Sequence, residues 1–140
     1  MKTTILVIDD DPLIRQIADL VLTQAGYTVA SAGTGESGLK MAEHTRAGLI
    51  LLDIQMPDMS GLNVLKILRR SRRAKIPVMM LTSRSDLDTI KAALAAGADG
   101  YMVKPFKPAD LLRRVDAALK PAIETPPPPQ PALSTSFILD

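Results

Sequence analysis

The chain has 140 residues, of which 46% are hydrophobic, and its formal net charge is +2. This length suits one domain with a sizeable core. The absence of cysteine excludes a disulfide scaffold and a thiolate metal site. No apolar run reaches the length of a membrane span and no signal peptide is recognisable, so we expect a cytoplasmic protein without a membrane partner. The small net charge does not favour direct binding to nucleic acid.

Four short, β-prone hydrophobic runs are each followed at once by a polar residue. The runs cover residues 5–8, 49–52, 78–81 and 101–103, and they are followed by Asp9, Asp53, Thr82 and Lys104. Continuously apolar strands are typical of a parallel sheet that is covered on both faces. The carboxyl ends of such strands share one edge, where open α/β sheets place their sites. We therefore expect the four polar side chains, together with Asp10, to lie at one edge.

Between these runs, apolar residues recur at helical spacing. Helices are predicted after Pro12, over about 35–46, 61–70 and 86–96, and after Pro108, with a further strand near 29–32. The helix over 86–96 is expected to bury Leu87, Ile90 and Leu94. This alternation predicts an α/β fold: a flavodoxin-like (βα)5 doubly wound parallel sheet, strand order 2-1-3-4-5, in a three-layer sandwich.

In that strand order, the first and third strands are neighbours roughly 5 Å apart. The carboxylates of Asp9, Asp10 and Asp53 would then lie within reach of one metal ion. Like charges at a few Å repel by roughly 1–4 kcal/mol at effective dielectrics of 80 to 20. The Lys104 ammonium and a divalent cation would relieve this repulsion. Because all the ligands on offer are oxygens, Mg²⁺ is the expected cofactor.

The sequence resembles a known family, the receiver domain of two-component response regulators, in its chemotaxis-regulator-like form. The resemblance covers residues 4 to about 120. It is carried by four motifs: Leu6-Val7-Ile8-Asp9-Asp10-Asp11, Leu51-Leu52-Asp53-Ile54-Gln55-Met56-Pro57-Asp58-Met59-Ser60-Gly61, Met80-Leu81-Thr82-Ser83, and Ala96-Gly97-Ala98-Asp99-Gly100-Tyr101 leading to Lys104-Pro105-Phe106. Their joint order and spacing make the resemblance specific.

The resemblance implies that Asp53 is the phospho-acceptor, which takes a phosphoryl group from a sensor histidine kinase or a histidine phosphotransfer protein. It implies that Asp10 and Asp53 bind Mg²⁺, that Asp9 assists directly or through water, and that the Gln55 backbone carbonyl is a further ligand. Lys104 would pair with the phosphoryl oxygens. The chain would then be no enzyme in the ordinary sense, since it catalyses only its own phosphorylation and autodephosphorylation.

The resemblance also implies a switch. The Thr82 hydroxyl would turn onto the phosphate, and Tyr101 would rotate inward, so that the surface formed by the last helices and strand changes. The Lys104–Pro105 bond is expected to be cis. The changed surface would be bound by a downstream protein target, by a missing output domain or, in a phosphorylation-dependent dimer, by a second copy of the chain.

Two segments differ from the rest in composition. Residues 121–140 contain six of the eleven prolines, so we expect domain 1–120 to be followed by a disordered tail or linker. The basic run 69–75 is expected to be a solvated helix end, with a docking patch for an acidic partner as the alternative.

Several readings stay open on the residues alone. Asp53 could cap a turn, Tyr101 could be a static core aromatic, and Asp11 suits a helix start better than a metal. An aspartate-nucleophile phosphohydrolase would use the same groups, but such enzymes carry a second Asp two places after the nucleophile, where this chain has Gln55. A binding module that works without phosphorylation is the third reading.

Overall fold

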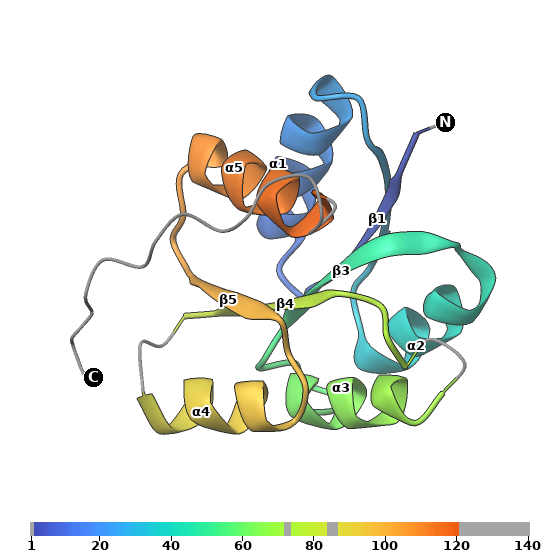
Figure 1. The fold of residues 1–140 in the computed structure, drawn as a ribbon, viewed down its shortest axis with the longest axis vertical. Helices are drawn as coiled ribbons and strands as arrows, with labels where there is room; N and C mark the ends of the chain where they lie inside the picture. Colours follow the sequence, from blue (N-terminus) through green and yellow to red (C-terminus); the bar gives the residue numbers. More distant parts are fainter. Residues whose placement is uncertain (1, 72–73, 84–86, 121–140) are drawn as a thin grey trace.

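In the computed structural model, which describes residues 2–71, 74–83 and 87–120, strands and helices alternate along the chain (Figure 1). The elements are β1 (Thr4–Ile8), α1 (Pro12–Gln24), β2 (Thr28–Ala32), α2 (Gly35–His44), β3 (Ala47–Asp53), α3 (Gly61–Arg69), β4 (Val78–Thr82), α4 (Leu87–Ala95), β5 (Gly100–Val103) and α5 (Pro108–Leu119). The predicted elements are confirmed, with ends that differ by one or two residues. Within the described residues, the helices are too short or too polar to cross a membrane.

All strand pairs are parallel, and the sheet has the order β2-β1-β3-β4-β5, as the sequence predicted. Ile8 pairs with Leu52 in the β1–β3 register, and Asp53 pairs with Leu81 in the β3–β4 register. The three central strands therefore end at nearly the same level. This register brings the residues that follow β1 and those that end β3 and β4 to one edge.

The central strands are buried on both faces, which explains their uninterrupted aliphatic sequence. Alternate residues of β1 serve two separate clusters: Ile5 and Val7 pack with α1 and α5, whereas Leu6 and Ile8 pack with α2, α3 and α4. Figure 1 shows the same division, with α1 and α5 on one side of the sheet and the other helices on the opposite side. The predicted three-layer sandwich is confirmed.

Helix α1 has clear start and stop signals. The Asp11 carboxylate accepts a hydrogen bond from the Leu13 N–H at 2.9 Å, so this residue is the helix cap that the sequence suggested. After the helix, Gly26 has a φ of +101°. Its N–H donates to the Thr23 carbonyl, and the next N–H donates to the Leu22 carbonyl. This is a Schellman ending, which requires a left-handed residue and so favours glycine.

The prediction for the inner face of α4 is partly wrong. Ile90 is buried as expected, but its buried partner is Ala93, while Leu87 and Leu94 are 61% and 46% exposed. The buried stripe of the helix is therefore narrow: Ile90 and Ala93 lie three residues apart on one face, while the first residue and the flank of the helix are in solvent. Hydrophobic spacing indicates a face but not how much of it the sheet covers.

The expected disordered tail, residues 121–140, lies outside the described residues. So do Arg72 and Arg73 of the basic run. Of the rest of that run, Arg70, Ser71 and Lys75 are exposed, as expected for a solvated helix end. Arg69 is different, because its guanidinium donates to the Gly97 carbonyl and to the Ile76 carbonyl. This residue ties the end of α3 to the turn before β5.

Candidate functional site

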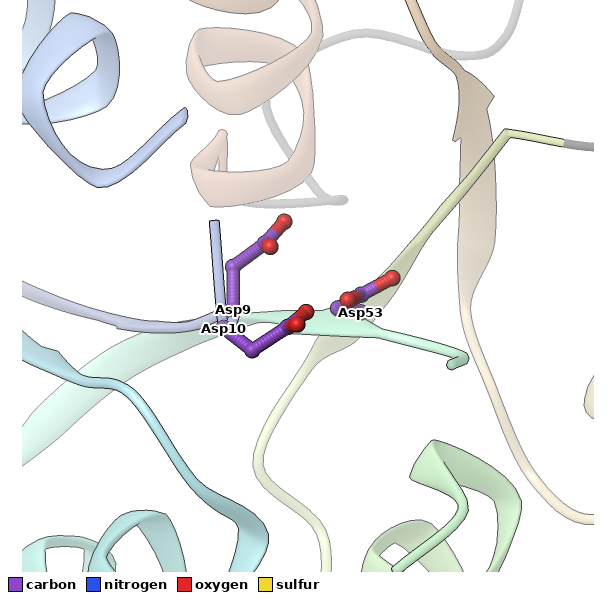
Figure 2. Close-up of side chains that lie close together, drawn as sticks. All are labelled: Asp9, Asp10 and Asp53. Atoms are coloured by element: carbon purple, nitrogen blue, oxygen red, sulfur yellow. The ribbon is translucent and has the colours of Figure 1, made fainter. Parts of the chain in front are cut away.

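Three carboxylates converge at the carboxyl edge of the sheet. Asp9 and Asp10 follow β1, and Asp53 is the last residue of β3. One oxygen from each lies within 4.8 Å of the others. Figure 2 shows the Asp10 carboxylate directed toward that of Asp53, with the Asp9 carboxylate above them in this view. The predicted meeting of residues 10 and 53, which are far apart in the chain, is therefore confirmed.

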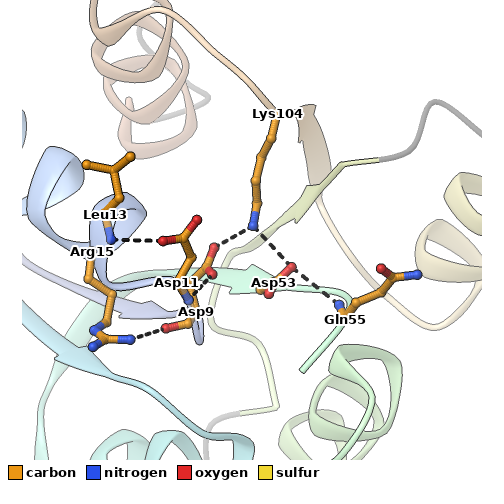
Figure 3. Close-up of polar contacts among 7 residues, drawn as sticks. All are labelled: Asp9, Asp11, Leu13, Arg15, Asp53, Gln55 and Lys104. Carbon is orange, nitrogen blue, oxygen red and sulfur yellow. Dashed lines mark hydrogen bonds and ion pairs between the residues drawn. The ribbon is translucent and has the colours of Figure 1, made fainter. Parts of the chain in front are cut away.

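Lys104 supplies the counter-charge from the end of β5. Its Nζ lies 2.8 Å from Asp9 Oδ2 and 3.3 Å from Asp53 Oδ1 (Figure 3). Burial opposes the charged form of Lys104, but the hydrogen bond and charge of Asp9, followed by Asp53, raise its pKa above the ordinary value. The Lys104–Pro105 peptide bond is cis, as expected. The ammonium thus stands charged between two carboxylates.

Asp9 is fully buried and has both carboxylate oxygens occupied. Its Oδ1 accepts from the Asp11 N–H at 2.9 Å, while Oδ2 faces the lysine. Its backbone carbonyl accepts from Arg15 Nη1 at 2.7 Å. These bonds fix the loop after β1. They also leave Asp9 less free for direct metal binding than Asp10, which is exposed to solvent.

Asp53 is 4% exposed, and its environment raises the pKa of its carboxyl to about 7. Burial is the largest cause, followed by the charge of Asp9; Lys104 acts in the opposite direction. Its Oδ1 also accepts from the Gln55 N–H at 3.3 Å. The charged form of Asp53 is therefore unfavourable near neutral pH unless a further cation approaches.

A hard divalent cation fits this set of groups. The donors are carboxylate oxygens, and no thiolate or imidazole belongs to the cluster. Asp10 is open to solvent, which allows a hydrated ion to approach, and Asp53 carries a carboxylate that needs charge compensation. Mg²⁺ keeps several waters and uses one or two carboxylates, which suits Asp10 and Asp53.

Thr82 and Tyr101, the two expected switch residues, lie on the neighbouring strands β4 and β5. Thr82 ends β4 and is 2% exposed; Leu81, the residue before it, pairs with Asp53. Tyr101 on β5 pairs with Met80 and is half-buried against the core on the α4 side of the sheet. Because side chains alternate along a strand, Thr82 and Met80 point to the same side of the sheet as the tyrosine. The two expected switch residues thus share a face.

Two residues around the site received no role from the sequence. Arg15 holds the loop after β1 through the Asp9 carbonyl, and Asp58 accepts hydrogen bonds from the Gly35 and Glu36 amides at the start of α2. The position of Arg15, four residues after the helix cap Asp11, could have suggested that it faces this loop. The partners of Asp58 are more than 20 residues away, so no local pattern indicates them.

Comparison with known proteins identifies the class that this fold and site define. The family model of the response regulator receiver domain matches residues 5–116. The chain belongs to this family, in agreement with the resemblance seen in the sequence.

Individual relatives agree. The chain is 38% identical over 120 residues to the DNA-binding response regulator MtrA of Mycolicibacterium smegmatis, a match that covers 86% of this chain and 52% of that protein. It is 40% identical over 119 residues to the probable transcriptional regulator ycf27 of Porphyridium aerugineum, covering 85% and 49%. Among solved structures, chemotaxis protein CheY4 of Vibrio cholerae matches with a TM-score of 0.81 and 34% identity, covering 85% of this chain and all of that one. The chain spans about half the length of these curated relatives.

Proposed function

We propose that Asp53 accepts a phosphoryl group from a phosphohistidine, carried by a sensor histidine kinase or a histidine phosphotransfer protein. The observation that carries this proposal is the convergence of Asp53 with Asp9, Asp10 and Lys104 at one sheet edge. Membership of the receiver family supports a phosphodonor of this kind. In this role the domain is a signalling switch whose only chemistry is the gain and loss of its own phosphoryl group.

The geometry supports the following transfer. An Asp53 carboxylate oxygen attacks phosphorus, the nitrogen–phosphorus bond of the phosphohistidine breaks, and the imidazole leaves with the electron pair and gains a proton. An acyl phosphate remains on Asp53. Lys104, already 3.3 Å from Asp53 Oδ1, would pair with the phosphoryl oxygens as their charge develops.

Asp10, Asp53 and the Gln55 backbone carbonyl would hold Mg²⁺, with Asp9 acting directly or through a water. The ion supplies charge neutralisation between the acceptor carboxylate and the incoming phosphoryl group. The donor set and the raised pKa of Asp53 support this assignment.

The switch uses Thr82 and Tyr101. We propose that the Thr82 hydroxyl binds the new phosphate and that the space it leaves lets Tyr101 turn inward. Their shared face of the sheet supports this coupling. The part of the surface that changes would be built by α4, β5 and α5, which can then bind a partner or a second copy of the chain.

The chain spans about half the length of its curated relatives, which supports a receiver that is part of a longer regulator. We propose that this receiver belongs to a cytoplasmic transcription regulator and that residues 121–140 link it to an output domain. The relatives named as DNA-binding response regulators support an output of that kind.

The phosphohydrolase alternative finds no support. The residue two places after Asp53 is Gln55, whose exposed amide cannot act as a general acid. The module that works without phosphorylation is disfavoured for another reason, because all the acidic groups and Lys104 are in place.

The proposal is tested by incubating the full chain with phosphoramidate, which contains the nitrogen–phosphorus bond of a phosphohistidine, and Mg²⁺. Intact-mass spectrometry should show one added phosphoryl group, which EDTA and Asp53→Asn abolish. The matched control is Asp19→Asn, because Asp19 is an exposed carboxylate on α1 that accepts a hydrogen bond from the Thr23 hydroxyl. Equal phosphorylation of Asp53→Asn and the wild type would refute the assignment.

A further inference from the structure

We propose that Asp58 is a positioning residue for the metal site. By binding the first amides of α2, its carboxylate holds the β3–α3 loop, residues 54–60, in the conformation that presents the Gln55 carbonyl to Mg²⁺. This inference rests on the proposed function and deepens it, because it explains how one ligand of the ion is kept in place.

The inner end of the loop is closed tightly on β3. The Gly61 N–H donates to the Ile54 carbonyl at 2.6 Å. A Cβ at Gly61 would lie only 2.0 Å from the Asp53 carbonyl oxygen, so this approach requires glycine. Gln55 is also bound at this end, through its N–H to Asp53 Oδ1. These contacts hold the loop at Ile54, Gln55 and Gly61, and they do not hold its outer half around Asp58.

Asp58 fixes the outer half. Its Oδ1 accepts from the Gly35 N–H and its Oδ2 from the Glu36 N–H, both at 3.0 Å. These amides open α2, a helix of 10 residues, and have no partner within the helix. The hydrogen bonds from Gly35 and then Glu36 lower the pKa of Asp58, so the carboxylate is charged when it binds. A carboxylate at a helix N-terminus is also favoured by the helix dipole.

The neighbouring residue adds a second contact to the same helix. A Cβ at Gly35 would lie 2.4 Å from Met59 Cγ and 2.9 Å from Met59 Sδ. Met59 therefore fills the space above Gly35 that any other residue would need. Two consecutive loop residues are thus seated on the start of α2, one by hydrogen bonds and one by packing.

This seating matters because a backbone carbonyl is a metal ligand only where its loop holds it. Held at both ends, the loop does not have to be ordered when the ion binds, and the affinity is correspondingly higher. Partners that orient metal ligands typically change affinity 10- to 100-fold. Asp58 acts on one ligand through the loop, so we expect the lower end, about tenfold weaker Mg²⁺ binding in Asp58→Ala.

The experiment is an isothermal titration of the full chain with MgCl₂ at pH 8. Thr34→Ala is the matched control for helix stability, since the Thr34 hydroxyl caps the same helix by accepting from the Ser37 N–H. Glu36→Gln is the control for charge, because it removes an exposed carboxylate next to the same amides. Asp58→Asn keeps the shape and one acceptor oxygen, and we expect about threefold weaker binding.

A loss in the two Asp58 variants, with both controls within about twofold of the wild type, supports the proposal. Unchanged affinity in Asp58→Ala overturns it, as does an equal loss in either control. If Asp58→Ala does not fold, Asp58→Asn decides in the same way. Asp10→Asn distinguishes a failure of the metal site from a failure of the role of Asp58. If Asp10→Asn binds Mg²⁺ like the wild type, the proposed metal site is refuted. If Asp10→Asn binds Mg²⁺ more weakly while both Asp58 variants bind it like the wild type, only the role of Asp58 is refuted.

Discussion

The buried carboxyl of Asp53 makes the metal-free domain less stable as the pH rises, and Asp53→Asn should remove this dependence. In the folded protein the pKa is raised to about 7, above the ordinary value of 3.8. The folded state therefore binds this proton more tightly than the unfolded state. Its contribution to stability is fully present below the unfolded pKa and is lost as the pH rises through the folded one.

The size of the effect follows from these two values. Between pH 5 and pH 8, the loss from this one group amounts to about 2–3 kcal/mol of the free energy of unfolding. Most of it falls between pH 5 and pH 7, where Asp53 is protonated in the folded state and charged in the unfolded state. This is a substantial share of the stability of a small domain, which is of order 5–15 kcal/mol.

The assay is urea unfolding in EDTA at pH 5, 6, 7 and 8, for the wild type and for Asp53→Asn. We expect the wild type to lose about 2–3 kcal/mol more than the variant over this range. Added Mg²⁺ should restore the wild type at pH 8 and should change the variant much less, because the ion stabilises the charged carboxylate. Parallel pH profiles for the two proteins would refute the argument that Asp53 is desolvated and crowded by Asp9.

Three further predictions concern packing and charge. Lys104→Met leaves the buried Asp9 carboxylate without its counter-charge and should lower the free energy of unfolding at pH 8 by about 3 kcal/mol. The control Arg113→Met removes an exposed ion pair with Asp110 and should lower it by less than about 1 kcal/mol. Similar losses in these two urea titrations would contradict the burial argument. Gly61→Ala should cost about 3 kcal/mol or more because its Cβ meets the Asp53 carbonyl, while Gly100→Ala, with nothing within 4 Å, should be nearly neutral in the same assay. Millimolar Mg²⁺ should raise the melting temperature of the wild type in differential scanning fluorimetry, and an equal rise in Asp53→Asn would count against the metal site.

The sequence predicted the sheet and its site edge well because both depend on local patterns. Aliphatic runs mark buried parallel strands, and the polar residue after each run marks the carboxyl edge. The meeting of Asp10 with Asp53 then followed from the strand order, and the structure confirms it. The chemical roles of these residues stay predictions until phosphorylation and metal binding are measured.

Features that depend on tertiary contacts could not be predicted in the same way. The exposure of Leu87 and Leu94 depends on how much of α4 the rest of the fold covers, and hydrophobic spacing alone does not indicate this. The contact of Asp58 with the start of α2 joins residues more than 20 positions apart. The raised pKa of Asp53 likewise depends on burial and on the distance to Asp9 in the folded chain.

The most direct test of the central claim is to map the phosphoryl group after transfer from a histidine phosphotransfer protein or phosphoramidate in Mg²⁺. Borohydride reduction of the acyl phosphate, followed by peptide mass spectrometry, marks the modified residue. We expect a single mark, on Asp53, which EDTA prevents. A mark on any other residue, or labelling that does not need a divalent cation, would contradict it.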